Sequence, residues 1–383
     1  MTTCPTERDP TGSPGQAAFD GQDAAPGRAL VIGTGLIGGS LGMALRRSGW
    51  HVAGVDTDPG VVESAVSLGA IDEIGDDPDA DLVVVATPVH RSAAIIRDVL
   101  ADPRRPSTTV VTDVGSVKAS VLAAVDHPRF IGGHPMAGSE QVGIDGADPD
   151  LFVGTTWVLT PSTTSDPIAY ARLRSVVTGL GATVVALTAD RHDALVAVVS
   201  HVPHLTAVTL MDLAASLAEE HGSLLRLAGS GFRDMTRVAA GRPSIWLDIC
   251  ADNAPAIVST LDRLIDGLQA MRSRVAARDG ASLGEILDRA ALARRGLATH
   301  VPPTAGLTEV RVPVPDRAGV LAEITTLPAD LGINVVDFEI VHSLEGAWGV
   351  LVLVVGSSDA ATLSAALQER GYHPTSVSIE TPV

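Results

Sequence analysis

The stretch that decides the fold is Ala29-Leu30-Val31-Ile32-Gly33-Thr34-Gly35-Leu36-Ile37-Gly38, in which four apolar residues run directly into the pattern G-x-G-x-x-G. The apolar run predicts a buried strand, and residues 36–48 predict the helix that follows. A second strand is predicted at 51–56, so Asp56 ends it at the separation from the glycines that a dinucleotide site requires. The motif alone is weak, but this strand–turn–helix–strand context predicts a dinucleotide-binding turn.

Each position of the turn has its own physical role in that prediction. Gly33 permits the tight turn, Gly35 lets the backbone approach a pyrophosphate, and Gly38 lets the helix pack close to the sheet. The helix opens at Leu36-Ile37, where its N-terminus would stabilise phosphate charge. Asp56 would accept hydrogen bonds from ribose hydroxyls and repel a 2′-phosphate, which predicts NAD rather than NADP. The alternative is a glycine-rich turn that binds nothing.

Outward from this motif, residues 28–188 alternate short apolar runs with helical stretches. The alternation predicts a parallel, doubly wound α/β sheet of the Rossmann type. Thr87 and Pro88 end the third predicted strand, where a cofactor would pass the switch point of the sheet. The predicted strands are 29–32, 51–56, 82–86, 109–113, 130–132, 156–159 and 182–186, and the predicted helices are 36–48, 61–68 and 91–100.

From residue 189 to 298 the strand pattern gives way to helical periodicity. Residues 194–220 predict one long apolar helix that Pro203 would kink unless a break falls there, and 245–278 predict one or two more. A region so apolar and so helical is typical of a subunit interface. We therefore expect an all-helical domain that also forms a homodimer, with a monomeric bundle as the alternative.

The chain ends are different in character. Residues 1–27 are rich in Gly, Pro, Asp, Ser and Thr and lack a signal-peptide pattern, which predicts a disordered tail. Residues 299–306 contain two prolines and a glycine and are interpreted as a linker. Residues 307–383 then follow the order βαββαβ, the ferredoxin-like arrangement.

Composition excludes several classes of function. Of 383 residues 45% are hydrophobic and 19% charged, and the net charge of −18 makes nucleic acid a poor partner. No apolar run reaches the roughly 20 residues that span a bilayer, so no membrane partner is expected. The two cysteines lie far apart in the sequence, which favours a reducing cytoplasm over a disulfide framework. No metal-ligand spacing and no G-x-S-x-G hydrolase turn is present in the sequence.

Polar residues concentrate in segments 113–118, 132–140, 200–204 and 229–237. The runs G-G-H-P-M-A-G-S-E at 132–140 and G-F-R-D-M-T-R at 231–237 are highly specific, and with them residues 28–297 resemble the prephenate and arogenate dehydrogenase family. Residues 307–380, with Pro-Asp-Arg-Ala-Gly-Val-Leu at 315–321, resemble an ACT regulatory domain. Many members of the dehydrogenase family carry such a domain, so the two resemblances support each other.

The resemblance implies a reaction in which a hydride leaves the ring carbon that bears the 4-hydroxyl and the ring carboxylate leaves as carbon dioxide. His134 is similar to the family's base, and imidazole titrates near working pH; a loop histidine that bonds only backbone is the alternative. Ser116 would hold His134, the hydroxyl or the nicotinamide in place, and it could also be a helix N-cap. Lys118, the single lysine of the chain, could be catalytic, but we favour a structural or electrostatic role.

Arg237 is similar to the family's substrate arginine, because a guanidinium offers bidentate binding to a carboxylate; a surface salt bridge is the alternative. Glu140 and Asp234 resemble positions that pair with arginines at the pocket mouth, with Arg233 as a candidate partner. His201 is expected to be structural. The residues that the resemblance places near the substrate are His204, Arg237, Trp246, Ser230, Glu140 and Asp234.

In the ACT-like segment the regulatory residues would be Asp316, Gly319 and Asn334, and Gly319 would let a ligand approach the backbone. Pathway logic makes tyrosine the expected feedback effector, with phenylalanine or another amino acid as the alternative ligand. An ACT domain that only assists dimerisation is the alternative.

We expect prephenate as the substrate, with arogenate as the alternative. The two differ by a keto group or an amine on the side chain, so one or two contacts in the pocket decide between them. Within enzymes, 3-hydroxyacid dehydrogenases and pyrroline carboxylate reductases also join a Rossmann domain to a helical one, but would lack the His134 and Arg237 runs. A different class, a catalytically inactive sensor of NAD and amino acids, is disfavoured by the intact set Ser116, His134 and Arg237.

Overall fold

A computed structural model describes residues 26–138, 141, 143–241, 243–296, 306–315, 317–342 and 348–379. The chain divides into two compact units, one formed by residues up to Leu205 with Ala240–Thr260, the other by Thr206–Ala239 with residues from Leu261 onward. Almost all of the predicted tail at 1–27 and of the predicted linker at 299–306 lies outside the described residues.

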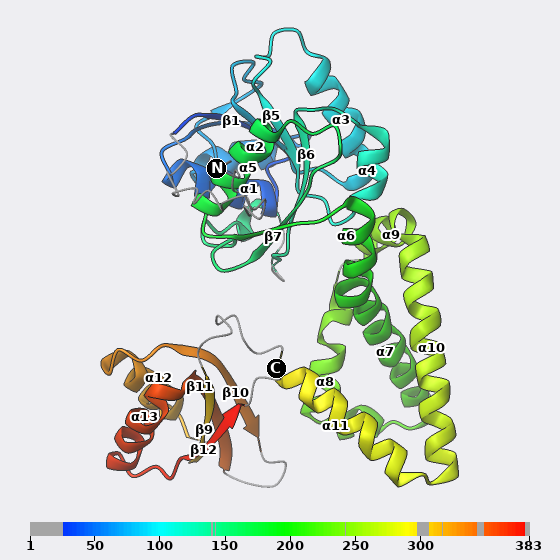
Figure 1. Ribbon diagram of the computed structural model, residues 1–383, viewed down its shortest axis with the longest axis vertical. Helices are drawn as coiled ribbons and strands as arrows, with labels where there is room; N and C mark the ends of the chain where they lie inside the picture. Colours follow the sequence, from blue (N-terminus) through cyan, green and yellow to red (C-terminus); the bar gives the residue numbers. More distant parts are fainter. Residues whose placement is uncertain are drawn as a thin grey trace, which may run out of the picture. The chain divides into compact units, whose positions relative to one another are not determined.

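The first unit is built on an eight-stranded sheet with the order β3-β2-β1-β4-β5-β6-β7-β8. Strands β1, β5, β6 and β7 of this sheet are labelled in Figure 1. Its pairs are parallel except β6–β7, which is antiparallel. The parallel strands therefore bring the carboxyl ends of β1, β2, β4, β5 and β6 to one edge. The strands are β1 (Arg28–Ile32), β2 (His51–Val55), β3 (Glu73–Ile74), β4 (Leu82–Val85), β5 (Val110–Asp113), β6 (Phe130–Pro135), β7 (Thr156–Thr160) and β8 (Thr183–Ala186).

The helices of this sheet are anchored by local capping and by burial. The side chains of Asp58 and Asp166 each accept a hydrogen bond from the N–H two residues on, and a proline follows each at the first helical position. Every residue of β4 and β5 is buried, and each fully buried Val or Leu contributes roughly 1.5–3 kcal/mol. The helices are α1 (Leu36–Arg47), α2 (Pro59–Ser67), α3 (Val89–Ala101), α4 (Ala119–Ala124) and α5 (Pro167–Gly179), with a short 3₁₀ turn η1 (Ile144–Gly146).

The Rossmann-like sheet is confirmed, with three corrections. The pair β6–β7 is antiparallel, whereas a wholly parallel sheet was expected; apolar periodicity identifies strands and carries no information on their direction. Strand β3 has only two residues, both exposed, so it leaves no apolar pattern. Helices α4 and α5 were not predicted, although the Asp166-Pro167 pair is a helix-start signal.

The helical region begins with a nearly continuous rod. A π-helical turn, η2 (Ala197–His201), joins α6 (Ala189–Val196) to α7 (Val202–Glu220), so Pro203 follows directly after a turn in which the regular α-helical hydrogen-bond pattern is already interrupted. By length and composition, residues Ala189–Glu220 could cross a membrane, but the core helix of a soluble protein can have the same length and composition. The remaining elements are η3 (Leu224–Leu227), α8 (Ser230–Thr236), η4 (Arg237–Ala240), α9 (Pro243–Asp252), α10 (Ala254–Ala277) and α11 (Gly280–Gly296).

The C-terminal part is a four-stranded antiparallel sheet with the order β10-β11-β9-β12 and two helices. It has the βαββαβ order that the sequence predicts. Its core includes Ile324, Leu351, Leu353 and Leu363, each wholly buried. The elements are β9 (Leu307–Pro315), α12 (Val320–Asp330), β10 (Val335–His342), β11 (Trp348–Gly356), α13 (Ser357–Glu369) and β12 (Thr375–Ile379).

Candidate active site

The glycine turn after β1 has the geometry of a phosphate cradle. Gly33 has φ +96°, and a Cβ there would lie 2.5 Å from the carbonyl oxygen of Ala86. A Cβ on Gly38 would lie 1.9 Å from the carbonyl oxygen of Gly33, so both glycines are required by the fold itself. Gly35 differs, because a Cβ there would meet nothing within 4 Å. Gly35 also precedes the first residues of α1, Leu36 and Ile37, so the open space lies at a helix N-terminus.

Asp56 is held against this turn. Its Oδ2 accepts a hydrogen bond from the Thr34 N–H at 2.9 Å, and its Oδ1 accepts one from the Asp58 N–H at 3.0 Å. Thr87 and Pro88 follow β4 at the same edge of the sheet, and Pro88 precedes α3. An open cradle, a helix N-terminus and a carboxylate beside them fit the diphosphate and ribose of NAD.

His134 lies in β6, at the same edge. Glycines precede it because neighbouring strands leave no room: a Cβ on Gly133 would lie 2.7 Å from the Asp113 carbonyl oxygen. Asp113 also accepts the Gly133 N–H at 3.1 Å, and Lys118 Nζ donates to the Gly133 carbonyl at 2.7 Å. The backbone just before His134 is thus fixed by groups at the end of β5.

The side chain of His134 has a partner that sequence reasoning missed. Its Nδ1 lies 2.8 Å from Nε2 of His192, and the two rings meet edge to face with centroids 5.0 Å apart. Nδ1 of His192 lies 2.7 Å from Oδ1 of Asp193. His192 is fully buried and Asp193 is 4% exposed. Two adjacent titratable residues at the start of an apolar helix were the available signal.

Burial is the main reason that the pKa of His134 is lowered well below the ordinary 6.5; the positive charge of Lys118 and the electrostatic interactions with His192 and His201 lower it further. A neutral His134 is the form that can accept a proton. Burial also lowers the pKa of Lys118 from 10.5, although the buried Asp113 carboxylate opposes that shift.

A second cluster lies around Trp246. Its ring stacks on His204 with centroids 3.5 Å apart and an interplanar angle of 9°, and it meets His201 edge to face. His204 is buried, and burial lowers its pKa. His201 is 1% exposed, and its Nδ1 accepts a hydrogen bond from Asn253 Nδ2 at 3.1 Å. The structure therefore brings His204 and Trp246 together.

Ser116 lies in the loop after β5 and is partly buried. The N-cap of α4 is Lys118, so the capping role considered for Ser116 is wrong. The first N–H groups of that helix are capped from elsewhere: Asp193 accepts from the Lys118 N–H at 2.9 Å and from the Ala119 N–H at 2.8 Å. Lys118 itself is fully buried against Asp113.

Other predicted residues lie in the second unit. Ser230 begins α8, Asp234 lies within it, and Arg237 begins η4; all three are exposed. Asp234 and Arg233 are both described and form no ion pair with each other. Glu140 lies outside the described residues.

In the C-terminal sheet, Gly319 precedes α12 with φ +89°, a left-handed conformation that favours glycine. Asn334 is exposed just before β10. Asp316 lies outside the described residues.

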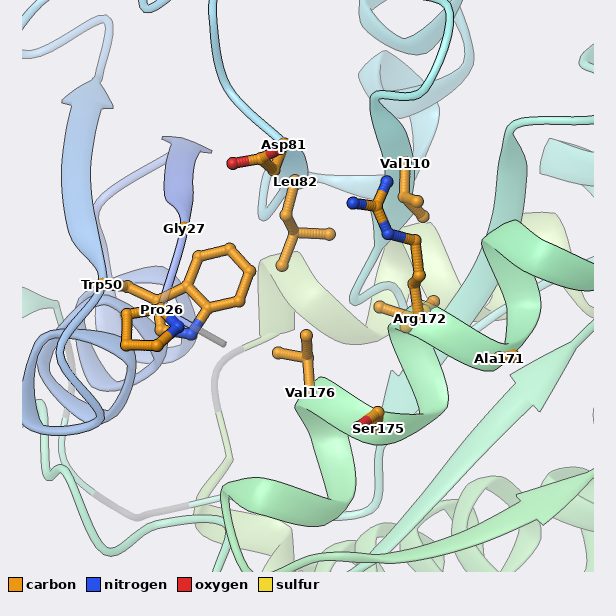
Figure 2. A pocket seen from close by; sticks show the side chains of 11 residues that line it. Pro26, Gly27, Trp50, Asp81, Leu82, Val110, Ala171, Arg172, Ser175 and Val176 are labelled. Carbon is orange, nitrogen blue, oxygen red and sulfur yellow. The ribbon is translucent and has the colours of Figure 1, made fainter. Parts of the chain in front are cut away.

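A cavity of about 470 Å³ opens at the opposite edge of the sheet. Figure 2 shows that it lies where β1, β4 and β5 begin, against Arg172 and Val176 of α5. None of the predicted catalytic or cofactor residues lines it, so it is separate from the site at the carboxyl edge.

Comparison with known families gives two matches. Residues 41–186 match the nucleotide-binding domain of prephenate dehydrogenase, and residues 188–289 match the dimerization domain of prephenate dehydrogenase.

Individual relatives point to the same family. The prephenate dehydrogenase of Bacillus subtilis strain 168 is 31% identical over 343 residues, covering 86% of this chain and 92% of the relative. Among solved structures, Synechocystis arogenate dehydrogenase has 32% identity and a TM-score of 0.61, covering 70% of this chain and 98% of that one. Prephenate dehydrogenase from Aquifex aeolicus, solved with hydroxyphenyl propionate and NAD⁺, has 28% identity and a TM-score of 0.67, covering 72% of this chain and 100% of that one.

Proposed function

The chain belongs to the prephenate dehydrogenase family and is an NAD-dependent dehydrogenase, and from this premise we propose that it oxidises and decarboxylates prephenate to 4-hydroxyphenylpyruvate in tyrosine biosynthesis. The observation that carries the proposal is the position of His134, partly buried at the edge of the sheet where the glycine turn and Asp56 also lie, with burial lowering its pKa.

The residues that would hold NAD are the backbone of the turn Gly33–Gly38, with the N-terminus of α1, and Asp56. Bound NAD supplies the hydride acceptor. The open space at Gly35 would admit the diphosphate, and the Asp56 carboxylate, already oriented by two N–H groups, would accept from ribose hydroxyls. Thr87, Pro88 and Ser116 would border the nicotinamide end.

In the proposed reaction His134 accepts the proton of the 4-hydroxyl as hydride leaves the same carbon, so that carbon becomes a carbonyl. The ring carboxylate then departs as carbon dioxide, and its bonding electrons aromatise the ring and reach the carbonyl oxygen. His134 returns the proton to that oxygen, so no net proton is consumed or released. The base must therefore be unprotonated at the start of each turnover.

Arg237 is proposed to bind a carboxylate of the substrate, because its guanidinium can make two parallel hydrogen bonds. His204 and Trp246 are proposed to border the side chain of the substrate as one stacked unit. Ser230, Glu140 and Asp234 remain proposed contributors at the mouth of the pocket.

Arogenate is the second candidate substrate, favoured by the 32% identity to Synechocystis arogenate dehydrogenase. The test is NADH formation with each substrate in turn, on the wild type and on His134→Asn. We expect turnover of prephenate and a loss of about 10²–10⁴-fold in kcat in the variant, with NAD binding retained. Turnover of arogenate alone would change the substrate, and turnover of neither alongside normal NAD binding would refute the function.

We further propose that residues 307–383 form an ACT domain that binds tyrosine as a feedback inhibitor. The βαββαβ order and the left-handed Gly319 at the start of α12 support this. An alignment that covers 86% of the chain is longer than the segment 1–306, so the Bacillus relative also matches part of this domain. Asn334→Ala should weaken inhibition by tyrosine, and Gln368→Ala on the exposed side of α13 is the matched control. Equal inhibition of both variants would contradict the site.

The helical region is proposed to form a homodimer in the cytoplasm. Its match to a dimerization domain supports this, as do large apolar side chains left exposed on its helices. These include Val199 (65%), Leu213 (56%), Leu247 (72%), Val258 (54%) and Leu268 (57%). Sedimentation of the intact protein should give twice the chain mass of 39.3 kDa.

A further inference from the structure

Three side chains, beginning with the proposed base, form a continuous chain of hydrogen-bonding contacts. His134 Nδ1 lies 2.8 Å from His192 Nε2, and His192 Nδ1 lies 2.7 Å from Asp193 Oδ1. His192 is fully buried, and the Asp193 side chain is 6% exposed. Such a chain of hydrogen bonds fixes which ring nitrogen of each neutral histidine carries a proton, because one nitrogen of the ring can only donate and the other can only accept.

Asp193, the last residue of this hydrogen-bonded chain, is held in place by its own contacts. Asp193 accepts from the backbone N–H groups of Lys118 and Ala119, at 2.9 and 2.8 Å, and a backbone amide can only donate. Its backbone carbonyl accepts from Asn253 Nδ2 at 2.9 Å. The carboxylate is thus held in place as an acceptor, and Nδ1 of His192 must be the donor to it.

The proton positions follow from that anchor. With Nδ1 protonated, a neutral His192 presents an unprotonated Nε2, which accepts a hydrogen bond from His134. His134 then carries its proton on Nδ1, and its Nε2 is the nitrogen with the lone pair. In the opposite arrangement, His192 would donate to His134 Nδ1, the proton of a neutral His134 would sit on Nε2, and that nitrogen could accept nothing.

We infer that His192 and Asp193 are positioning residues of the dehydrogenation, which hold His134 in the tautomer whose Nε2 accepts the substrate proton. The inference rests on the proposed role of His134 as the base. His192 and Asp193 do not touch the reacting atoms; they act through the imidazole in front of them. A purely structural role, in which the pair only joins the start of α6 to the start of α4, is the competing explanation.

The variants His192→Gln and His192→Leu distinguish the positioning role from the purely structural role. The carboxamide oxygen of glutamine can accept from His134 Nδ1, whereas leucine fills a similar volume without an acceptor. We expect kcat to fall at least about 100-fold in His192→Leu and to stay within about tenfold of wild type in His192→Gln. KM should change less than about threefold in both, because the substrate is not contacted. His51→Leu, at the amino end of β2, is the control for loss of a histidine.

A second measurement needs no turnover. Histidine ¹⁵N resonances of the intact protein report which ring nitrogen is protonated, and His134→Asn assigns the signals of that residue. In the wild type His134 should show a protonated Nδ1 and an unprotonated Nε2. In His192→Leu it should shift toward the Nε2-protonated tautomer that free neutral imidazole side chains prefer in water.

Two results would overturn the inference: equal kcat losses in His192→Gln and His192→Leu, or a wild-type His134 protonated on Nε2. Failure of the proposed function is a different result, namely wild-type protein that turns over neither prephenate nor arogenate. The nuclear magnetic resonance measurement still decides the tautomer in that case.

Discussion

Lys118 donates a hydrogen bond from its ammonium to the carboxylate of Asp113, and both side chains are completely buried. The pair links the end of β5 to the backbone of Gly133, which directly precedes His134. The only lysine of the chain therefore serves the interior of the protein rather than its surface. This agrees with the structural or electrostatic role favoured for it.

Lys118→Met should destabilise the protein by about 3–5 kcal/mol, because it leaves the Asp113 carboxylate buried without its counter-charge. Urea unfolding followed by tryptophan fluorescence measures the change. The double variant Lys118→Met/Asp113→Asn should lose less than the single variant, since the uncompensated charge is gone. A single-variant loss under about 1 kcal/mol would contradict this interpretation.

Gly35→Ala should separate cofactor binding from folding. No atom lies within 4 Å of the added methyl group, so the melting temperature should stay near that of the wild type. The dissociation constant for NAD should rise at least about tenfold, because the methyl group occupies the path of the diphosphate. Gly38→Ala is the matched control and should unfold the domain. Unchanged NAD affinity in Gly35→Ala would exclude this turn as the binding site.

The activity should resist acidification. Because burial and nearby charges lower the pKa of His134 well below 6.5, the base stays neutral as the pH falls through that value. We expect kcat/KM to remain level through pH 6.5 and to decline only at lower pH. Initial rates across a pH series measure this, and a decline that begins at or above pH 6.5 would contradict it.

The stability of the fold, unlike the activity, should be sensitive to acidification below pH 6.5. Burial lowers the pKa of His201 from 6.5 to about 4, so below pH 6.5 the unfolded chain binds a proton that the folded chain does not. The free energy of unfolding should therefore fall between pH 6.5 and about 4, and be insensitive to this group above 6.5. His201→Gln, which keeps an acceptor for Asn253, should flatten the slope of urea midpoints against pH. An identical slope in both proteins would refute the assignment.

The fold could be predicted from the sequence largely because its strands are short apolar runs that alternate with helical stretches. The run 29–38 defines the cofactor turn by itself, since each glycine answers a local steric demand. Strand direction is not local, which is why the antiparallel pairing of β7 with β6 was missed. The C-terminal βαββαβ order was read correctly because turn residues separate its elements.

The site was predicted less completely, because some of its contacts join residues that are far apart in the sequence. Motif residues such as His134 and Asp56 are found by their neighbours in sequence. The pairing of His134 with His192 joins residues 58 positions apart, and only the tertiary packing of the chain brings them together. Asn253, which binds both Asp193 and His201, carries no sequence signal at all.

The π-helical turn Ala197–His201 takes in one more residue than an α-helical turn would. Every side chain beyond it is rotated by roughly a hundred degrees relative to an uninterrupted helix. Asn253 Nδ2 contacts both the carbonyl of Asp193, which precedes the turn, and the ring of His201, which is its last residue. Deletion of one residue within the turn would leave a longer regular helix and turn His204 away from Trp246, so the inserted residue sets the direction of the helix face on which the two rings stack.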